Sequence, residues 1–316
     1  MKSSRHLSYF NRSLKKAGVW AALVGVALLM ACSFSMDDKT VITPSEPSIQ
    51  QVLPSLMPTV TRTLTPTVTV TPSPVPSPEP TVCGKAHGEI RKVLLYSEIL
   101  GQDVPVNVYL PPCYDPGMQG GYPLLVLLHG QGSNEQHWIE LGLTTAADDL
   151  ISTHQIPPVV IVMPQERDHR MDSKLSPFVD VLVVDLLPQW QSLFNVHDER
   201  QFMAIGGISR GANWAVRIAF TRPLIFGIVG GHSFTTFASD MRLLPEWLEQ
   251  ISISDLPRLG FDVGEHDYYF KYSDPFVQEL QARDIPLTYV VQPGWHSPEY
   301  WAEHVVDYLL WYTQDW

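Results

Sequence analysis

Short runs of consecutive apolar residues alternate with amphipathic segments along most of this chain. Runs of about five residues that are apolar at successive positions are typical of strands buried on both faces of a parallel sheet. Five such runs occur, at 124–128, 159–163, 202–205, 225–229 and 287–291. Ahead of them, the alternating segments 91–100 and 104–112 predict an antiparallel pair of strands that leads into the sheet.

Helical patterns fill the gaps between these runs, at 143–152, 177–193 and 212–220. A last helix is predicted after Gly294, because Ser297 can cap it and Pro298 fits its first turn. One face of this helix is apolar or aromatic, with Trp301, Val305, Tyr308, Leu309 and Tyr312. Strands that alternate with helices predict an α/β fold with a mostly parallel central sheet, flanked by helices.

The first 32 residues have the composition of an export signal. A basic segment precedes the apolar run 17–31, which is shorter than the about 20 residues that a transmembrane helix needs. The run ends in Leu-Met-Ala-Cys, which resembles the lipobox of bacterial lipoproteins, where the cysteine is lipidated. We expect residues 1–32 to be a signal peptide with Cys32 as the lipidated residue. A plainly cleaved signal and an uncleaved anchor are the alternatives, and all three place the rest of the protein outside the cytoplasm.

Residues 33–82 are rich in proline, threonine and serine, with ten prolines between Pro44 and Pro80. Such a segment cannot bury enough apolar area to offset its ordering entropy, so it predicts a disordered, extended linker. The remaining residues, 83–316, suit one sizeable α/β domain.

Charge and cysteine content narrow the possible functions. The net charge is −12 and the pI is about 5.3, which argues against a nucleic-acid partner. Besides Cys32, only Cys83 and Cys113 occur, and in an oxidising compartment they form a candidate disulfide. The sequence contains no Cys/His cluster with zinc spacing, so we expect no metal and no cofactor.

The segment GGISRGA, residues 206–212, contains the pattern G-x-S-x-G around Ser209. The string alone is weak, but it stands between a predicted strand, which Gly206 and Gly207 are expected to end, and a predicted helix. Strand, tight turn and helix in this order are the context of a nucleophile elbow, in which flanking glycines allow the close backbone approach. Ser209 is therefore the candidate nucleophile.

A serine nucleophile needs a base and an acid that orients the base. In this fold they follow the serine in the order acid, histidine. His296 is the only histidine in the loop before the last helix. The acid should follow the penultimate strand, where Asp262, Glu265 and Asp267 occur. We favour Asp267, because it lies beyond the strand in the loop, while Asp262 lies inside the apolar run.

Two backbone amides should stabilise the oxyanion. We expect them from Arg210, which follows the nucleophile, and from Gln131 in the loop after the strand 124–128. We also expect substrate contacts from Trp138, His232 and Trp295, although packing explains Trp138 as well.

These pieces together resemble the esterase family of α/β-hydrolases, which includes esterase D-like enzymes, feruloyl esterases, enterochelin esterases and the antigen 85 mycolyltransferases. The matching segments are VYLPPCYD, YPLLVLLHGQGSNEQHW, AIGGISRGANWA, DVGEHDYY and GWHSPEYW. The resemblance implies an α/β-hydrolase fold, the triad Ser209, Asp267 and His296, and oxyanion amides at Gln131 and Arg210. The family commonly has Met-Gly-Gly after the serine, where this chain has Arg-Gly-Ala. The Arg210 side chain therefore either favours an anionic substrate or pairs with an acid in the following helix.

The resemblance leaves the substrate open, because family members act on feruloyl sugars, siderophores, formylglutathione and mycolates. We expect an extracytoplasmic serine ester hydrolase, tethered to the membrane and acting on a small-molecule or carbohydrate-linked ester. An acyltransferase with the same acyl-enzyme and a non-catalytic binding domain are the alternatives. The segment 231–257 is expected to form part of a lid, although core packing explains its aromatic residues equally well.

Overall fold

The computed structural model describes residues 84–316. The predicted signal peptide, the lipidation site Cys32, the linker and Cys83 lie outside these residues. The strands are β1 (Glu89–Ser97), β2 (Gln102–Leu110), β3 (Leu124–Leu128), β4 (Val160–Pro164), β5 (Met203–Ile208), β6 (Ile228–His232), β7 (Arg258–Gly264) and β8 (Leu287–Gln292). The helices are α1 (His137–Glu140), α2 (Leu143–Ser152), α3 (Phe178–Asp180), η1 (Val181–Leu186), α4 (Leu187–Leu193), η2 (Arg200–Phe202), α5 (Arg210–Thr221), α6 (Asp240–Gln250), η3 (Ile253–Asp255), α7 (Phe270–Gln281) and α8 (Pro298–Thr313).

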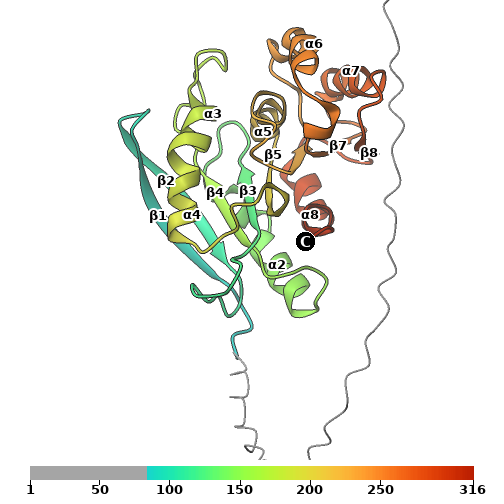
Figure 1. Ribbon diagram of the computed structural model, residues 1–316. Coiled ribbons are helices and arrows are strands. Elements are labelled where there is room, and N and C mark those ends of the chain that lie inside the picture. The colour runs from blue at the N-terminus through green and yellow to red at the C-terminus, as the bar shows by residue number, and fades with distance from the viewer. Residues whose placement is uncertain (1–83) are drawn as a thin grey trace, which may run out of the picture. The chain divides into compact units, whose positions relative to one another are not determined.

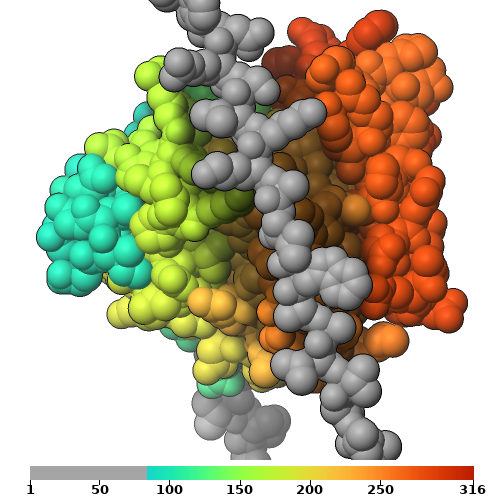
Figure 2. All heavy atoms as spheres, turned by 90° about the horizontal axis from the view of Figure 1, so that it is seen from above, coloured from blue at the N-terminus to red at the C-terminus, as the bar shows by residue number. Residues whose placement is uncertain are grey.

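The eight strands form one sheet in the order β1-β2-β4-β3-β5-β6-β7-β8. The pairs β1–β2 and β2–β4 are antiparallel, and all other pairs are parallel. Apart from the exchange of β3 and β4, the strands follow the sequence order from one edge of the sheet to the other, so β1 and the C-terminal strands lie at opposite sides (Figures 1 and 2). The mostly parallel sheet and its antiparallel entry are the α/β-hydrolase arrangement expected from the sequence, and this prediction is confirmed.

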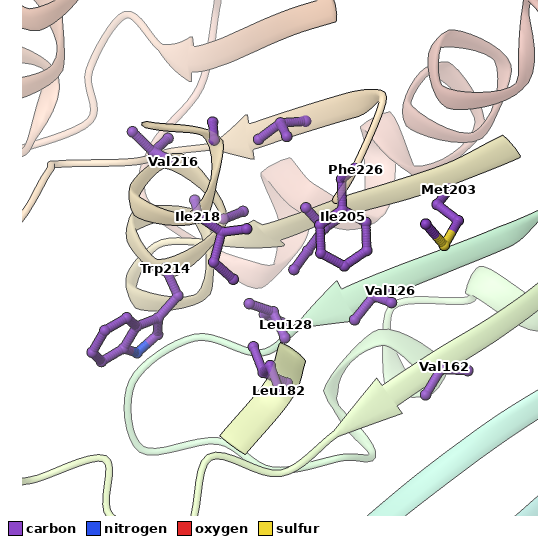
Figure 3. Packing of buried hydrophobic residues seen from close by; sticks show 14 of the residues in the cluster. Val126, Leu128, Val162, Leu182, Met203, Ile205, Trp214, Val216, Ile218 and Phe226 are labelled. Carbon is purple, nitrogen blue, oxygen red and sulfur yellow. The ribbon is translucent and has the colours of Figure 1, made fainter. Parts of the chain in front are cut away.

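Two apolar clusters cover the two faces of the sheet. Helices α4 and α5 pack on one face, where Leu128, Ile205 and Trp214 meet in a common layer (Figure 3). Helices α2 and α8 supply the cluster on the other face, together with side chains of β3 and β4. Strands covered on both sides must be apolar at every position, which explains the unbroken apolar runs of β3 and β4.

Strand β5 is longer than predicted, because Gly206 and Gly207 continue it to Ile208 instead of ending it. The reason is the side chain of Tyr312, whose hydroxyl group lies over Gly206 and over Gly230 of the neighbouring strand. A Cβ atom at either glycine would overlap the tyrosine ring. Strand β6 likewise runs through two glycines to His232, beyond the predicted strand end, with Gly230 packed under Tyr312 and Gly231 against Phe261.

The segment 231–257 contains helix α6, which was not predicted. Phe234, Phe237 and Leu244 are buried in the cluster that α5 shares, so core packing accounts for these residues of the expected lid. Helix α7 was also missed, and it places Phe276 in the same cluster. Both helices contain an internal proline, which lowers their helical signal in the sequence.

Cys113 takes part in a disulfide, at a position with a positive φ of 63°. Its pairing with Cys83 stays a prediction, since Cys83 is outside the described residues. None of the helices in residues 84–316 is long and apolar enough to cross a membrane.

We predict that Gly206→Ala destabilises the domain by about 1–3 kcal/mol, the usual range for overpacking a tight core. The added methyl group would overlap Tyr312, which is fully buried and cannot move aside. Urea denaturation followed by tryptophan fluorescence measures the change. Gly84→Ala is the matched control, because a Cβ there meets nothing within 4 Å. Equal stability of the two variants would contradict this account of the β5 glycines.

Candidate active site

Ser209 lies between β5 and α5 in a backbone conformation that few residues adopt, with φ 55° and ψ −115°. Its N–H donates to the carbonyl oxygen of His232 at 2.8 Å, and its own carbonyl accepts from the Asn213 N–H at 3.0 Å. The glycines on either side are required because other parts of the backbone approach them closely. A Cβ on Gly207 would strike the backbone of Gly211, and one on Gly211 would strike the carbonyl group of Leu128. The turn predicted from G-x-S-x-G is thus a strained elbow.

The three acids that the sequence left open each face a different histidine. Asp267 Oδ2 lies 2.7 Å from Nδ1 of His296. Asp262 Oδ1 lies 2.5 Å from Nδ1 of His232, inside the protein. Glu265 forms a solvent-exposed pair with the neighbouring His266 at 3.3 Å. The geometry therefore selects Asp267 as the partner of the histidine beside the serine.

Ser209, His296 and Asp267 form a continuous hydrogen-bonded chain. His296 Nε2 lies 3.0 Å from Ser209 Oγ, so the imidazole bridges the hydroxyl and the carboxylate. The Asp267 side chain is fully buried, and its Oδ1 accepts from the Tyr269 N–H at 2.7 Å. The rings of Tyr269 and Trp301 contact the imidazole edge-on, with centroids 4.8 and 5.1 Å from its own. The imidazole of His296 is therefore fixed in orientation as well as in distance from Ser209.

The loop after β3 borders the serine and is held by two histidines. Buried His129 donates from Nδ1 to the Gly130 carbonyl at 2.8 Å, and its Nε2 accepts from the Glu166 N–H at 2.9 Å. Burial lowers the pKa of His129, which keeps the ring neutral for this pair of bonds. His137 accepts the Gly130 N–H at Nδ1, at 3.3 Å. These contacts give His129 a structural role in holding the loop.

The two amides expected to bind an oxyanion have no protein acceptor within residues 84–316. Gln131 follows Gly130 in the loop, and Arg210 is the first residue of α5, where helix N–H groups have no intrahelical partner. A cavity of about 320 Å³ lies beside Ser209 and is lined by residues 130–133, His137, Ser209, His296 and Trp301. Gln131 is part of this lining, and Arg210 directly follows Ser209. An anion formed beside Ser209 would meet free donors.

The Arg210 side chain points away from this cavity. Its guanidinium forms two hydrogen bonds with Glu166, at 2.8 and 2.6 Å, and both side chains are almost completely buried. The guanidinium also lies 5.4 Å from the ring centroids of Trp214 and Phe237. Of the two alternatives, pairing with an acid is correct, but the acid comes from the loop after β4, not from the following helix.

Two of the three predicted substrate contacts are wrong. Trp138 is 1% exposed and donates its indole N–H to the Leu128 carbonyl, so it is a core residue. His232 is 4% exposed, and both ring nitrogens are occupied, by Asp262 and by the Tyr312 hydroxyl. Trp295 is 65% exposed beside the site and stays a prediction.

Trp301 lines the cavity and was not predicted as a site residue. The sequence assigns it only to the apolar face of α8, and that assignment also holds, because the residue is only 6% exposed. Its indole N–H donates to Ser233 Oγ at 3.0 Å, which fixes the ring against His296. Its position five residues after His296, directly after the SPEY segment, is the only sequence signal for this role. Among residues 84–316, no group of His, Cys, Asp and Glu is arranged to hold a metal ion.

Comparisons with known proteins point to one family, the esterases. A family model described as "Putative esterase" matches residues 97–312. An endo-1,4-beta-xylanase/feruloyl esterase of Xylanibacter ruminicola is 33% identical over 154 residues, which is 46% of this chain and 21% of that protein. An uncharacterized protein of Corynebacterium glutamicum is 28% identical over 128 residues, 38% of this chain and 30% of that protein. The chain thus covers less than a third of either relative.

Solved structures show the same fold at lower identity. A ferulic acid esterase superposes with a TM-score of 0.65 at 21% identity, over 72% of this chain and 99% of that one. An S-formylglutathione hydrolase of Staphylococcus aureus gives 0.61 at 18% identity, over 72% and 97%. The feruloyl esterase module of Clostridium thermocellum, complexed with sinapinate, gives 0.62 at 18% identity, over 73% and 89%.

We predict that Glu166→Gln destabilises the domain by about 3–5 kcal/mol, because it leaves the buried Arg210 charge without a counter-ion. Urea denaturation measures the loss. Asp180→Asn is the control, because it breaks the exposed Arg222–Asp180 pair and should cost less than about 1 kcal/mol. Two similar losses would show that the Glu166–Arg210 pair does not behave as a buried one.

Proposed function

Because the chain belongs to the esterase family whose model spans residues 97–312, we propose that it is a serine carboxylic ester hydrolase that acts through Ser209, His296 and Asp267. The observation that carries the proposal is the hydrogen-bonded chain from the strained serine through the imidazole to the buried carboxylate. A strained, solvent-reachable serine with a base at 3.0 Å is the arrangement that nucleophilic acyl transfer requires.

In the proposed mechanism, Ser209 Oγ attacks the ester carbonyl while His296 Nε2 takes the hydroxyl proton. Asp267 holds the proton on Nδ1 and stabilises the imidazolium that forms. The amides of Gln131 and Arg210 donate to the oxyanion of the tetrahedral intermediate. His296 then gives the proton to the leaving alcohol. In the second half of the reaction, a water molecule attacks the acyl-enzyme carbonyl while His296 takes its proton. His296 returns that proton to Ser209 Oγ as the acid is released.

Fixed hydrogen-bond donors account for much of the proposed rate enhancement. A donor set in place before the reaction needs no reorganisation when charge develops, and one such donor is worth about 3–4 kcal/mol. The Gly130 carbonyl and N–H are both engaged, by His129 and His137, so the loop that presents the Gln131 N–H is fixed at the preceding residue. Arg210 is fixed through its side-chain pair with Glu166.

We propose a feruloyl or related ester of a carbohydrate as the substrate class. The Xylanibacter relative and two of the similar structures are feruloyl or ferulic acid esterases, which supports this class. An S-formylglutathione hydrolase of the same fold shows that the fold alone does not fix the ester. An acyltransferase would use the same acyl-enzyme, but no contact within residues 84–316 favours a sugar acceptor over water.

We further propose that the enzyme works outside the cytoplasm, held at the bacterial membrane by a lipid on Cys32. The basic and apolar segments of residues 1–32 and the proline-rich segment 33–82 support this placement. The disulfide at Cys113 also supports an oxidising compartment.

We predict that Ser209→Ala lowers kcat for p-nitrophenyl acetate by about 10⁵–10⁶-fold and abolishes labelling by a fluorophosphonate probe. Asp267→Asn should lower kcat by about 10⁴-fold, because it favours the wrong imidazole tautomer. His266→Ala is the control, since this exposed side chain pairs with Glu265 and contacts the exposed Trp295 ring but touches neither Ser209 nor His296, and it should leave kcat within about twofold. Unchanged kcat in Ser209→Ala would remove the proposed function.

We predict that Cys32→Ser moves the protein from the membrane fraction to the soluble fraction and prevents incorporation of an alkyne-labelled fatty acid. Cellular fractionation and click labelling in a bacterial host check both results. Cys113→Ser serves as the control and should leave the lipid label in place. Labelling that persists in Cys32→Ser would contradict the lipid anchor and leave the esterase proposal untouched.

A further inference from the structure

His137 takes no part in the proposed mechanism, although its ring lines the cavity beside Ser209. The residue is 8% exposed and lies at the start of α1. The Trp301 ring, which contacts the catalytic imidazole, also contacts the His137 ring edge-on, with the centroids 5.7 Å apart. Both histidine rings thus contact the same tryptophan.

The hydrogen bond from Gly130 fixes the tautomer of His137. A ring nitrogen that accepts an N–H cannot itself carry a proton, so Nδ1 is unprotonated and the proton of the neutral ring is on Nε2. Burial, and the nearby His129, lower the pKa of His137 to about 4, so the ring is neutral under ordinary conditions.

The Nε2–H group has no acceptor within residues 84–316. It is also not among the side-chain atoms of these residues that are sealed from solvent without a partner. Because His137 lines the cavity of the serine, this donor is available to a molecule bound there.

The geometry of Gly130 shows how near the donor is to the reaction. A Cβ built on Gly130 would lie 3.5 Å from His137 Cε1 and 3.8 Å from Ser209 Cβ. These two atoms are therefore no more than the sum of those distances, 7.3 Å, apart. Cε1 is bonded to Nε2, so a small ester on Ser209 spans the gap.

We propose that His137 donates a hydrogen bond from Nε2 to an oxygen of the substrate close to the scissile ester, and so selects esters that carry an ether or hydroxyl oxygen there. This specificity role rests on the proposed ester hydrolysis at Ser209. It differs from loop support, which the Nδ1 side of the same ring provides.

The test compares isosteric substrates that differ by one oxygen. The acyl pair is p-nitrophenyl methoxyacetate and p-nitrophenyl butyrate, and the alcohol pair is 2-methoxyethyl acetate and butyl acetate. His137→Asn keeps an acceptor for the Gly130 N–H, because Oδ1 takes the place of Nδ1, but leaves no group that reaches the cavity. The ratio of variant to wild-type kcat/KM is taken for each ester, which cancels their different intrinsic reactivities.

We expect His137→Asn to lower kcat/KM by about fivefold to tenfold more for the oxygenated member of at least one pair than for its hydrocarbon analogue. His137→Gln, whose amide donor reaches further, should restore part of this preference. An equal loss for both members of both pairs would mean that His137 only supports the loop, and would overturn the inference.

A second measurement separates this inference from the proposed function. If the wild-type protein hydrolysed none of the four esters and did not label with a fluorophosphonate, the proposed function would fail. Independently of these assays, ¹⁵N NMR of histidine-labelled protein tests the donor itself. A proton on Nε2 of His137 is the expected result, and a proton on Nδ1 would overturn the inference even if the esters are hydrolysed.

Discussion

Ser209 occupies backbone angles whose cost is about 1–3 kcal/mol, and the surrounding structure holds it there. The strand end, the start of α5 and the end of β3 meet at this turn without room for a single extra carbon atom. A hydrogen bond from the Ser209 N–H to His232 ties the turn to the neighbouring strand. Because the turn is fixed, the Ser209 hydroxyl group and the Arg210 amide have fixed directions. The loops that carry His296 and Gln131 are therefore positioned relative to a hydroxyl group that does not move.

Two carboxylate–histidine pairs lie near this turn, and their surroundings give them different roles. In the pair at His232, the carboxylate of Asp262 also accepts from the hydroxyl groups of Tyr300 and Tyr308, and the imidazole is stacked on Tyr308. Every polar atom of that imidazole is occupied, so the pair stabilises the end of β6 and cannot exchange protons with a substrate. The imidazole of His296 instead keeps a solvent-reachable edge beside a hydroxyl group. The same two side-chain types thus form one pair that is closed off from solvent and one whose imidazole is 20% exposed beside Ser209, which is the pair proposed to react.

The sequence allowed the sheet, the serine turn and its two partners to be predicted, because each depends on local pattern and chain order. Asp267 could be preferred over Asp262 because one follows the strand and the other lies inside it. The errors concern contacts between segments far apart in the chain. Nothing near His232 indicates that the last helix will bury it, and nothing near Arg210 points to Glu166, 44 positions earlier. Glycines in β5 resemble a strand end until Tyr312 is placed above them.

The position of Tyr312 also couples the last helix to the strand that leads to Ser209. This tyrosine, close to the end of α8, fills the space that Gly206 and Gly230 leave open beside β5 and β6, and His296 precedes the same helix. A displacement of α8 would therefore disturb the packing of β5 and the position of the imidazole beside Ser209 at the same time.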